Sequence, residues 1–306
     1  MTERNYVVEL TSQELELKYE SLTISDDFIF GKVMQEKENC IGMLKRLTGN
    51  LISDDIIINN QHTIRVAVDG KGVRYDIYVE DERRAMYDAE MQNSDTQIIL
   101  PKRARFYQGL MDLNYLEMGN EYRNLVDSYI IFICTFDPFG KGFCCYEFEN
   151  NCSGYEEITG LPLGDGRKIL IYNTKGTVIN VDEDTLRFLK FIDEGIPSDD
   201  YTKRLQSSVA MARLNREWKV EYMKTFLHDS DVRWEGIEIG KEIGKEIQRI
   251  ELICCKLRKG KSPEIISDEL EEELDNIQFI CDIASEFAPE YDSQNVYQVY
   301  SERKSK

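Results

Sequence analysis

The segment from Ser128 to Phe136, SYIIFICTF, is a nearly continuous run of β-branched and aromatic residues, and it constrains the fold more than any other stretch. A run without a polar face predicts a strand that is buried on both sides of a sheet. Shorter apolar runs predict strands at 143–148 and 168–173, separated by turns rich in Gly, Asp and Pro. Upstream, residues 56–59 and 63–68 are expected to form a strand or a strand pair.

A β-hairpin is predicted between residues 73 and 92. Its two strands, 73–79 and 85–92, place polar residues at alternate positions, which is the period of a half-buried strand. The turn at 80–84 is wholly charged, and we expect it to face solvent. One interpretation is a hairpin with one solvated face, since antiparallel sheets often alternate in this way.

The polar residues of this hairpin also suggest a site. Asp88, Glu90 and Gln92 are spaced so that they share one face of the second strand. If the two strands pair, Asp76 of the first strand comes near Glu90 across the ladder. Carboxylate and amide oxygens that converge at a sheet edge can bind a hard divalent cation. The hairpin residues alone leave both interpretations open.

Helices are predicted before and after the hairpin. Ser25 can cap a helix whose first turn carries Asp26 and Asp27, where acidic residues complement the helix dipole. A second helix, about 38–48, ends at a glycine. Pro101 opens a long helix, because proline is tolerated in the first turn. This helix is expected over about 102–119, with an apolar stripe of Phe106, Leu110, Leu113 and Leu116 and a basic start of Lys102, Arg103 and Arg105.

Up to about residue 176 this order of helices and strands indicates an α/β or α+β domain with a mixed sheet. Beyond it only helices are predicted, at 182–194, 197–229, 236–260, from 262 and at 275–287. Gly236, Gly240 and Gly244 each cost about 1 kcal/mol against alanine in a helix, so we expect them to permit close approach of another helix. The expected divisions are a polar lead (1–20), a core (21–176), a helical extension (177–235), a helical module (236–288) and a polar, fraying tail (289–306).

Composition excludes several classes of protein. Of the 306 residues 42% are hydrophobic, enough for a core. No run of about 18 uncharged apolar residues predicts a membrane span, and the charged N-terminus has no apolar signal core. The chain has two distant histidines and eight cysteines without a C-x-x-C pair, so a structural zinc site is not expected. Cysteines within apolar runs indicate buried thiols and a reducing, cytoplasmic location.

Motifs and charge narrow the chemistry further. The sequence lacks the phosphate loop G-x-x-x-x-G-K-[ST] and the G-x-S-x-G elbow, which argues against a nucleotide hydrolase and an α/β-hydrolase. The net charge of −19 argues against a broad, non-specific surface for nucleic acid, because phosphate is repelled. A local basic groove remains compatible with that charge.

Four segments in order, SDDFIFGKVM, VRYDIYVED, YDAEMQ and LPKRARFYQ, resemble the core of the PD-(D/E)xK nucleases, and among these the group of recombination-promoting nucleases and transposases. The Gly-spaced helix GIEIGKEIGKEI is similar to the helical C-terminal part of those proteins. The resemblance covers about residues 21–287. It implies an α/β fold with a restriction-endonuclease-like mixed-sheet core, followed by an all-helical C-terminal region.

The resemblance also implies roles for individual residues. Asp76 and Glu90 would ligate Mg²⁺, for which Mn²⁺ can substitute. The backbone carbonyl of Met91 would add an oxygen, and Asp27 would be an outer or additional ligand. Gln92 stands where many relatives carry lysine, so it would orient water and phosphate. Contacts with DNA phosphates are expected from Lys102, Arg103, Arg105 and Gln108. Asp88 lies outside the matched motif, and Tyr75 stands where proline is expected.

The function that this resemblance implies is a metal-dependent DNA endonuclease that hydrolyses phosphodiester bonds and promotes recombination. DNA would be its partner, no membrane is involved, and the C-terminal helices would form a homo-oligomer. The alternative is a catalytically silent binding module with a nuclease fold, which acts through helical self-association or a partner protein.

Overall fold

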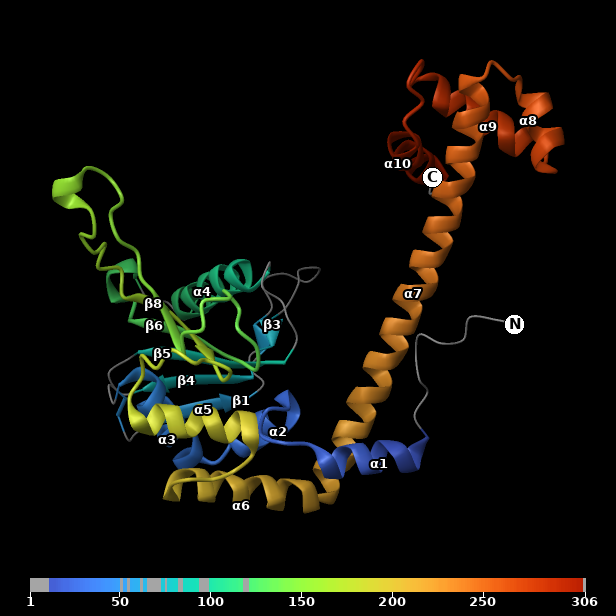
Figure 1. Cartoon of the computed structure of the whole chain (residues 1–306). Helices are drawn as coiled ribbons and strands as arrows, with labels where there is room; N and C mark the ends of the chain where they lie inside the picture. The colour runs from blue at the N-terminus through green and yellow to red at the C-terminus, as the bar shows by residue number, and fades with distance from the viewer. Residues whose placement is uncertain are drawn as a thin grey trace. The chain divides into compact units, whose positions relative to one another are not determined.

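The computed structural model (Figure 1) describes residues 11–49, 52–53, 56–60, 63–64, 73–74, 76–81, 85–93, 99–117 and 121–304. Predictions for Tyr75 and for residues 65–68 and 82–84 lie outside the described residues. The chain divides into two compact units, Leu10–Met223 and Lys224–Lys306, which we describe separately. Among the described residues, no helix combines the length and the apolar character that a membrane span requires.

A six-stranded mixed sheet forms the centre of the first unit. Its strands are, in spatial order, β1 (Ile56–Asn60), β4 (Ile77–Asp81), β5 (Met86–Gln92), β6 (Ser128–Cys134), β8 (Arg167–Asn173) and β7 (Cys145–Phe148). The central pairs β5–β6 and β6–β8 are parallel, and the outer pairs are antiparallel. Strands β2 (Thr63–Ile64) and β3 (Val73–Arg74) form a separate antiparallel ribbon. The expected mixed-sheet α/β fold is confirmed.

Burial is complete along the two central strands β5 and β6. The prediction for β6 is therefore confirmed, because its apolar run is covered on both faces. The hairpin with one solvated face is wrong, since every residue of β5 is buried despite its polar alternation. The charged turn also begins later than predicted: Asp81 is buried, and its Oδ1 accepts a hydrogen bond of 2.8 Å from the Ala85 N–H.

Helix α4 (Leu100–Glu117) covers one face of the sheet, the face that carries Met86, Ile130 and Phe132 (Figure 1). The predicted apolar stripe of this helix is wrong in part, because Phe106 and Leu113 are exposed. The residues of α4 that pack in the core are Leu100, Ala104, Tyr107, Leu110, Met111 and Tyr115. The helix is thus rotated so that its aromatic and small residues, with their i, i+3 and i+4 spacing, face the strands.

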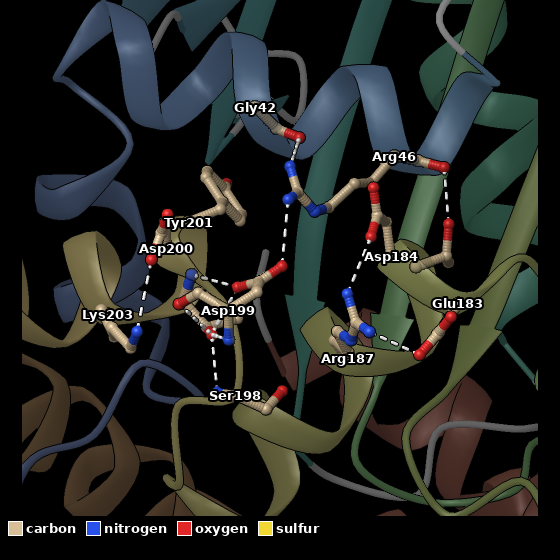
Figure 2. A network of polar contacts seen from close by, with 12 residues as sticks. Gly42, Arg46, Glu183, Asp184, Arg187, Ser198, Asp199, Asp200, Tyr201 and Lys203 are labelled. Carbon is tan, nitrogen blue, oxygen red and sulfur yellow. Dashed lines mark hydrogen bonds and ion pairs between the residues drawn. The ribbon is translucent and has the colours of Figure 1, made fainter.

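The other helices of this unit are α1 (Ser12–Ser21), α2 (Asp27–Val33), α3 (Lys37–Thr48), α5 (Glu183–Glu194) and α6 (Asp200–Leu214). Helix α1 forms where only a polar lead was predicted, since it buries Leu15 and Tyr19. Helices α3, α5 and α6 are joined by the polar network of Figure 2. There Arg46 ion-pairs with Asp199 at 3.2 Å and lies over the Tyr201 ring at 4.0 Å.

The second unit contains α7 (Arg216–Arg258) from Lys224 onward, together with α8 (Pro263–Leu270), α9 (Leu274–Ser285) and α10 (Ser293–Lys304). Ile250, Ile253 and several isoleucines of α8 and α9 form its core. The fraying tail was predicted wrongly: α10 is helical and buries Val296 and Tyr300 in that core. A Cβ atom at Gly236, Gly240 or Gly244 would meet no atom of another described element within 4 Å, so the described residues do not make the expected close helix approach there.

Candidate functional site

Asp76 and Glu90 meet at the start of β4. The β4–β5 ladder pairs Ile77 with Ala89, which brings the preceding Asp76 beside Glu90. The Asp76 N–H donates to Glu90 Oε1 at 3.0 Å, and the Met91 N–H donates to Asp76 Oδ2 at 3.2 Å. The expected proximity of Asp76 and Glu90 is confirmed. Asp76 lies in a bend between β3 and β4, however, and not in the middle of one strand.

The polar face of β5 is buried under α4. The side chains of Asp88, Glu90 and Gln92 belong to residues with 0%, 3% and 7% of their surface exposed. Burial raises the pKa of the Asp76, Asp88 and Glu90 carboxyls, because it penalises the charged form. The Glu90 charge raises the pKa of the other two further. The three side chains form the acidic cluster of this site.

Asp88 is the least compensated member of the acidic cluster. Neither of its carboxylate oxygens accepts a hydrogen bond from a described residue. When protonated, Asp88 can donate to Glu90, and this contact raises the pKa of Asp88 and lowers that of Glu90. The cluster therefore needs positive charge nearby when its carboxyls are ionised.

Arg103 supplies positive charge from the first turn of α4. Its Nη2 donates to Glu90 Oε2 at 3.2 Å, and its Nη1 donates to Gln92 Oε1 at 2.6 Å. The Tyr107 hydroxyl accepts hydrogen bonds from Arg103 Nε and Nη2 at 3.3 and 2.9 Å. The guanidinium also lies 5.2 Å from the Tyr107 ring and 5.6 Å from the Phe132 ring. Arg103 is therefore held by α4 and β6 while it pairs with β5.

Two further oxygens expected as ligands lie close by. The Met91 carbonyl accepts a hydrogen bond of 2.8 Å from the Gln92 side-chain amide, so Gln92 contacts both Met91 and Arg103. Asp27 is exposed at the start of α2, and its charge raises the pKa of both Asp76 and Glu90. The preceding Asp26 caps α2 through the Phe28 N–H, and burial raises its pKa to about 6.

The basic and amide residues predicted on α4 do not all join the acidic cluster. Lys102 and Arg105 are exposed on that helix. Gln108 is 1% exposed and donates to Ser128, which pairs with Met86 at the opposite end of β5. Four positions of strand separate Met86 from Glu90, roughly 13 Å at about 3.3 Å per residue. The expectation that Gln108 meets a phosphate at this site is not supported, because its side chain is in the core.

Sequence reasoning missed Tyr107 as part of the site. The signal was present, because Arg103 and Tyr107 are four residues apart and such pairs meet on a helix surface. It also treated Asp88 only as a neighbour, although its carboxyl is completely buried and neither of its oxygens has a hydrogen-bond partner among the described residues. Both residues contribute to the electrostatics around Glu90.

The donor chemistry of this site fits a hard divalent cation. Among the described residues, no group of three or more His, Cys, Asp or Glu side chains is arranged to hold a metal ion. Asp76 and Glu90 nevertheless present carboxylate oxygens side by side, and Asp88 adds two that have no donor. Oxygen ligands of this kind suit Mg²⁺ and Mn²⁺ and do not favour zinc.

A family model described as PD-(D/E)XK nuclease family transposase matches residues 26–224. The matched region contains the whole sheet, α4 and every residue of the site described above. No curated protein and no solved structure matches this chain significantly.

Proposed function

Because the chain belongs to the PD-(D/E)XK nuclease family transposases, we propose that it is a metal-dependent DNA endonuclease that hydrolyses phosphodiester bonds. The observation that carries this proposal is the contact between Asp76 and Glu90. Glu90 accepts the backbone N–H of Asp76, and Asp76 accepts the backbone N–H of Met91 in β5, so the two carboxylates are held side by side at the start of β4. A backbone-positioned pair of this kind is well suited to hold one ion in a fixed place.

Asp76 and Glu90 are the residues that would hold Mg²⁺ or Mn²⁺, with the Met91 carbonyl and Asp27 as further oxygens. Such a cation lowers the pKa of a bound water and offsets negative charge on the phosphate and the leaving oxygen. Both carboxylates must be ionised for this role. Burial raises their pKa values, and a bound cation would lower them again, because a nearby positive charge favours the ionised form.

In this chain, Gln92 and Arg103 together would take the role of the lysine that many relatives carry at the position of Gln92. The Gln92 amide is neutral, so it can orient a water or a phosphate oxygen but cannot stabilise a hydroxide by charge. Arg103 carries a permanent charge and a fork of donors that matches a phosphate group. Together they place one orienting amide and one cation beside Glu90.

DNA is the substrate that the family description supports, since a transposase acts on DNA. We extend the proposal to a role in recombination on the same basis. Lys102 and Arg105 are exposed beside Arg103 on α4, where they can contact neighbouring phosphates. The chain as a whole is strongly acidic, with a net charge of −19, so binding should concentrate on this helix and weaken steeply with salt.

A cleavage assay on supercoiled plasmid tests this proposal. We expect nicked or linear product with Mg²⁺ or Mn²⁺ and none with EDTA. Asp76→Ala should lower cleavage by about 10³-fold or more, because it removes a ligand that acts in the transition state. Asp200→Ala is the matched control, since Asp200 is a fully exposed carboxylate at the surface of α6.

The folded state of both variants is checked by circular dichroism and thermal melting. Cleavage by Asp76→Ala at the wild-type rate would refute the site, and cleavage that persists in EDTA would refute metal dependence. Cleavage of RNA but not of DNA would correct the substrate.

A second candidate function is a binding module with a nuclease fold, without catalysis, that acts through self-association or a partner. The neutral Gln92 and the separate helical unit with its own core favour it. In that case we expect DNA binding but no cleavage with either cation at any ionic strength. A homo-oligomer would appear in light scattering as a multiple of 35.7 kDa. Ile243→Glu, on an exposed position of α7, should then reduce the mass to that of one chain.

A further inference from the structure

Arg103 occupies oxygens that the proposed cation would need. We propose that Arg103 is the resident counter-ion of the acidic cluster, and that a divalent cation binds by displacing it from Glu90 and Gln92. This inference rests on the proposed function, because it takes Asp76 and Glu90 as the cation site. It adds that the divalent cation and the Arg103 guanidinium compete for the same carboxylate, that of Glu90.

Both oxygens of the Glu90 carboxylate already have donors. Oε1 accepts the Asp76 N–H at 3.0 Å, and Oε2 accepts Arg103 Nη2 at 3.2 Å. The first donor belongs to the backbone next to β4 and cannot leave without moving the chain. The second belongs to a side chain with several rotatable bonds. Of the two contacts, the one with Arg103 is therefore the one that an incoming cation replaces.

Electrostatics drives the exchange in the same direction. Asp76, Asp88 and Glu90 are close enough to affect one another, and Arg103 is the cation that hydrogen-bonds Glu90. A divalent ion at Glu90 compensates more negative charge than one guanidinium does. It also repels the guanidinium, because the two positive groups would share one carboxylate in a site of low dielectric constant.

Arg103 keeps an anchor when it leaves Glu90. The Tyr107 hydroxyl accepts two of its hydrogen bonds, and the rings of Tyr107 and Phe132 lie beside the guanidinium. The Arg103 side chain is 27% exposed, so part of it already faces solvent. Displacement therefore frees two donors without releasing the side chain from α4. Those donors become available to an anionic substrate only after the cation has bound.

Calorimetric titration of the whole protein with Mn²⁺ at pH 8, without DNA, tests this exchange. Arg103→Met should bind Mn²⁺ about 10- to 100-fold more tightly than the wild type, since no charge-assisted hydrogen bond has to be broken. Arg105→Met is the charge-matched control, because it removes an exposed cation from the same helix. Its affinity for Mn²⁺ should stay within about twofold of the wild type, because exposed charges are screened. Asp76→Ala should lose binding in every background.

A second measurement follows Arg103 directly. The ¹⁵Nε–H resonance of Arg103 is identified as the one that is missing in Arg103→Lys. In the wild type it should shift as Mg²⁺ is added, with the same midpoint as a calorimetric titration carried out with Mg²⁺. Weaker or unchanged Mn²⁺ affinity in Arg103→Met, with wild-type binding that depends on Asp76, would overturn the exchange and leave the proposed function intact. Absence of Mn²⁺ binding in both the wild type and Arg103→Met would contradict the proposed cation site itself.

Discussion

Replacing Asp88 by asparagine should stabilise the protein, and increasingly so as the pH rises. The Asp88 carboxyl is completely buried, lies beside Glu90 and receives no hydrogen bond from a described residue. Folding raises its pKa well above the usual value through burial and the Glu90 charge. An asparagine of nearly the same shape cannot ionise, and its amide can donate to Glu90 as a protonated Asp88 does.

The sign of the pH dependence follows from proton binding. An acid with a raised pKa binds more protons in the folded state than in the unfolded state. The free energy of unfolding of the wild type therefore falls as pH rises above about 3.9, the pKa of aspartate in an unfolded chain. Asp88→Asn removes this loss. The difference in stability should be smallest at pH 4.5 and largest at pH 8.

The magnitude follows from the cost of a buried group without a partner. That cost is about 1–3 kcal/mol and is greater for a charge, so we expect at least this gain at pH 8. For a unit of this size, it corresponds to an increase of about 2–12 °C in Tm.

The assay is chemical and thermal unfolding between pH 4.5 and 8.5 in EDTA, so that no divalent cation offsets the charge. Asp200→Asn is the control, because its carboxylate is fully exposed and should show no pH-dependent gain. A variant that is less stable than the wild type at pH 8 would refute the reasoning. So would a gain of the same size at pH 4.5 and pH 8, since it would show that ionisation is not the cause.

Three further predictions concern the packing of the first unit and of α7. Arg46→Met should lower the free energy of unfolding by about 3 kcal/mol, because it leaves the Asp199 carboxylate of a largely buried ion pair without its partner; urea unfolding measures this, and a loss below about 1 kcal/mol would contradict it. Gly42→Ala should destabilise by about 1–3 kcal/mol, because the new Cβ would clash with the Tyr201 ring. Gly240→Ala should instead stabilise α7 by up to about 1 kcal/mol, because its Cβ meets no atom and alanine favours helix; a loss of stability or of oligomeric mass in Gly240→Ala would indicate that a second chain packs there.

The alternation of β5 and the apolar run of β6 determined much of the fold. A period of two places Asp88, Glu90 and Gln92 on one face whatever lies above it, and the hairpin brings Asp76 beside Glu90. The uninterrupted apolar run could only be a strand covered on both faces. These features are local, because each depends on side-chain spacing within a few residues.

What packs over the polar face of β5 could not be predicted from local side-chain spacing. Alternation shows which residues share a face but not what packs against it, so a solvated hairpin and a buried acidic cluster had the same pattern. Helix α4 decides between them, because Tyr107 and Met111 pack on β5 and β6 and bury the carboxyls. The same contacts explain why the predicted stripe with Phe106 and Leu113 failed.

The sequence by itself determined which residues could form the site: acidic and amide residues at alternate positions of one strand, an aspartate across the ladder, and basic residues at the start of the next helix. Only the tertiary structure decided which of these residues meet. Lys102, Arg103 and Arg105 are adjacent and equivalent in sequence, yet the rotation of α4 directs Arg103 to Glu90 and leaves the other two exposed. That rotation is set by the packing of the whole helix against the sheet, which no single stretch of sequence specifies.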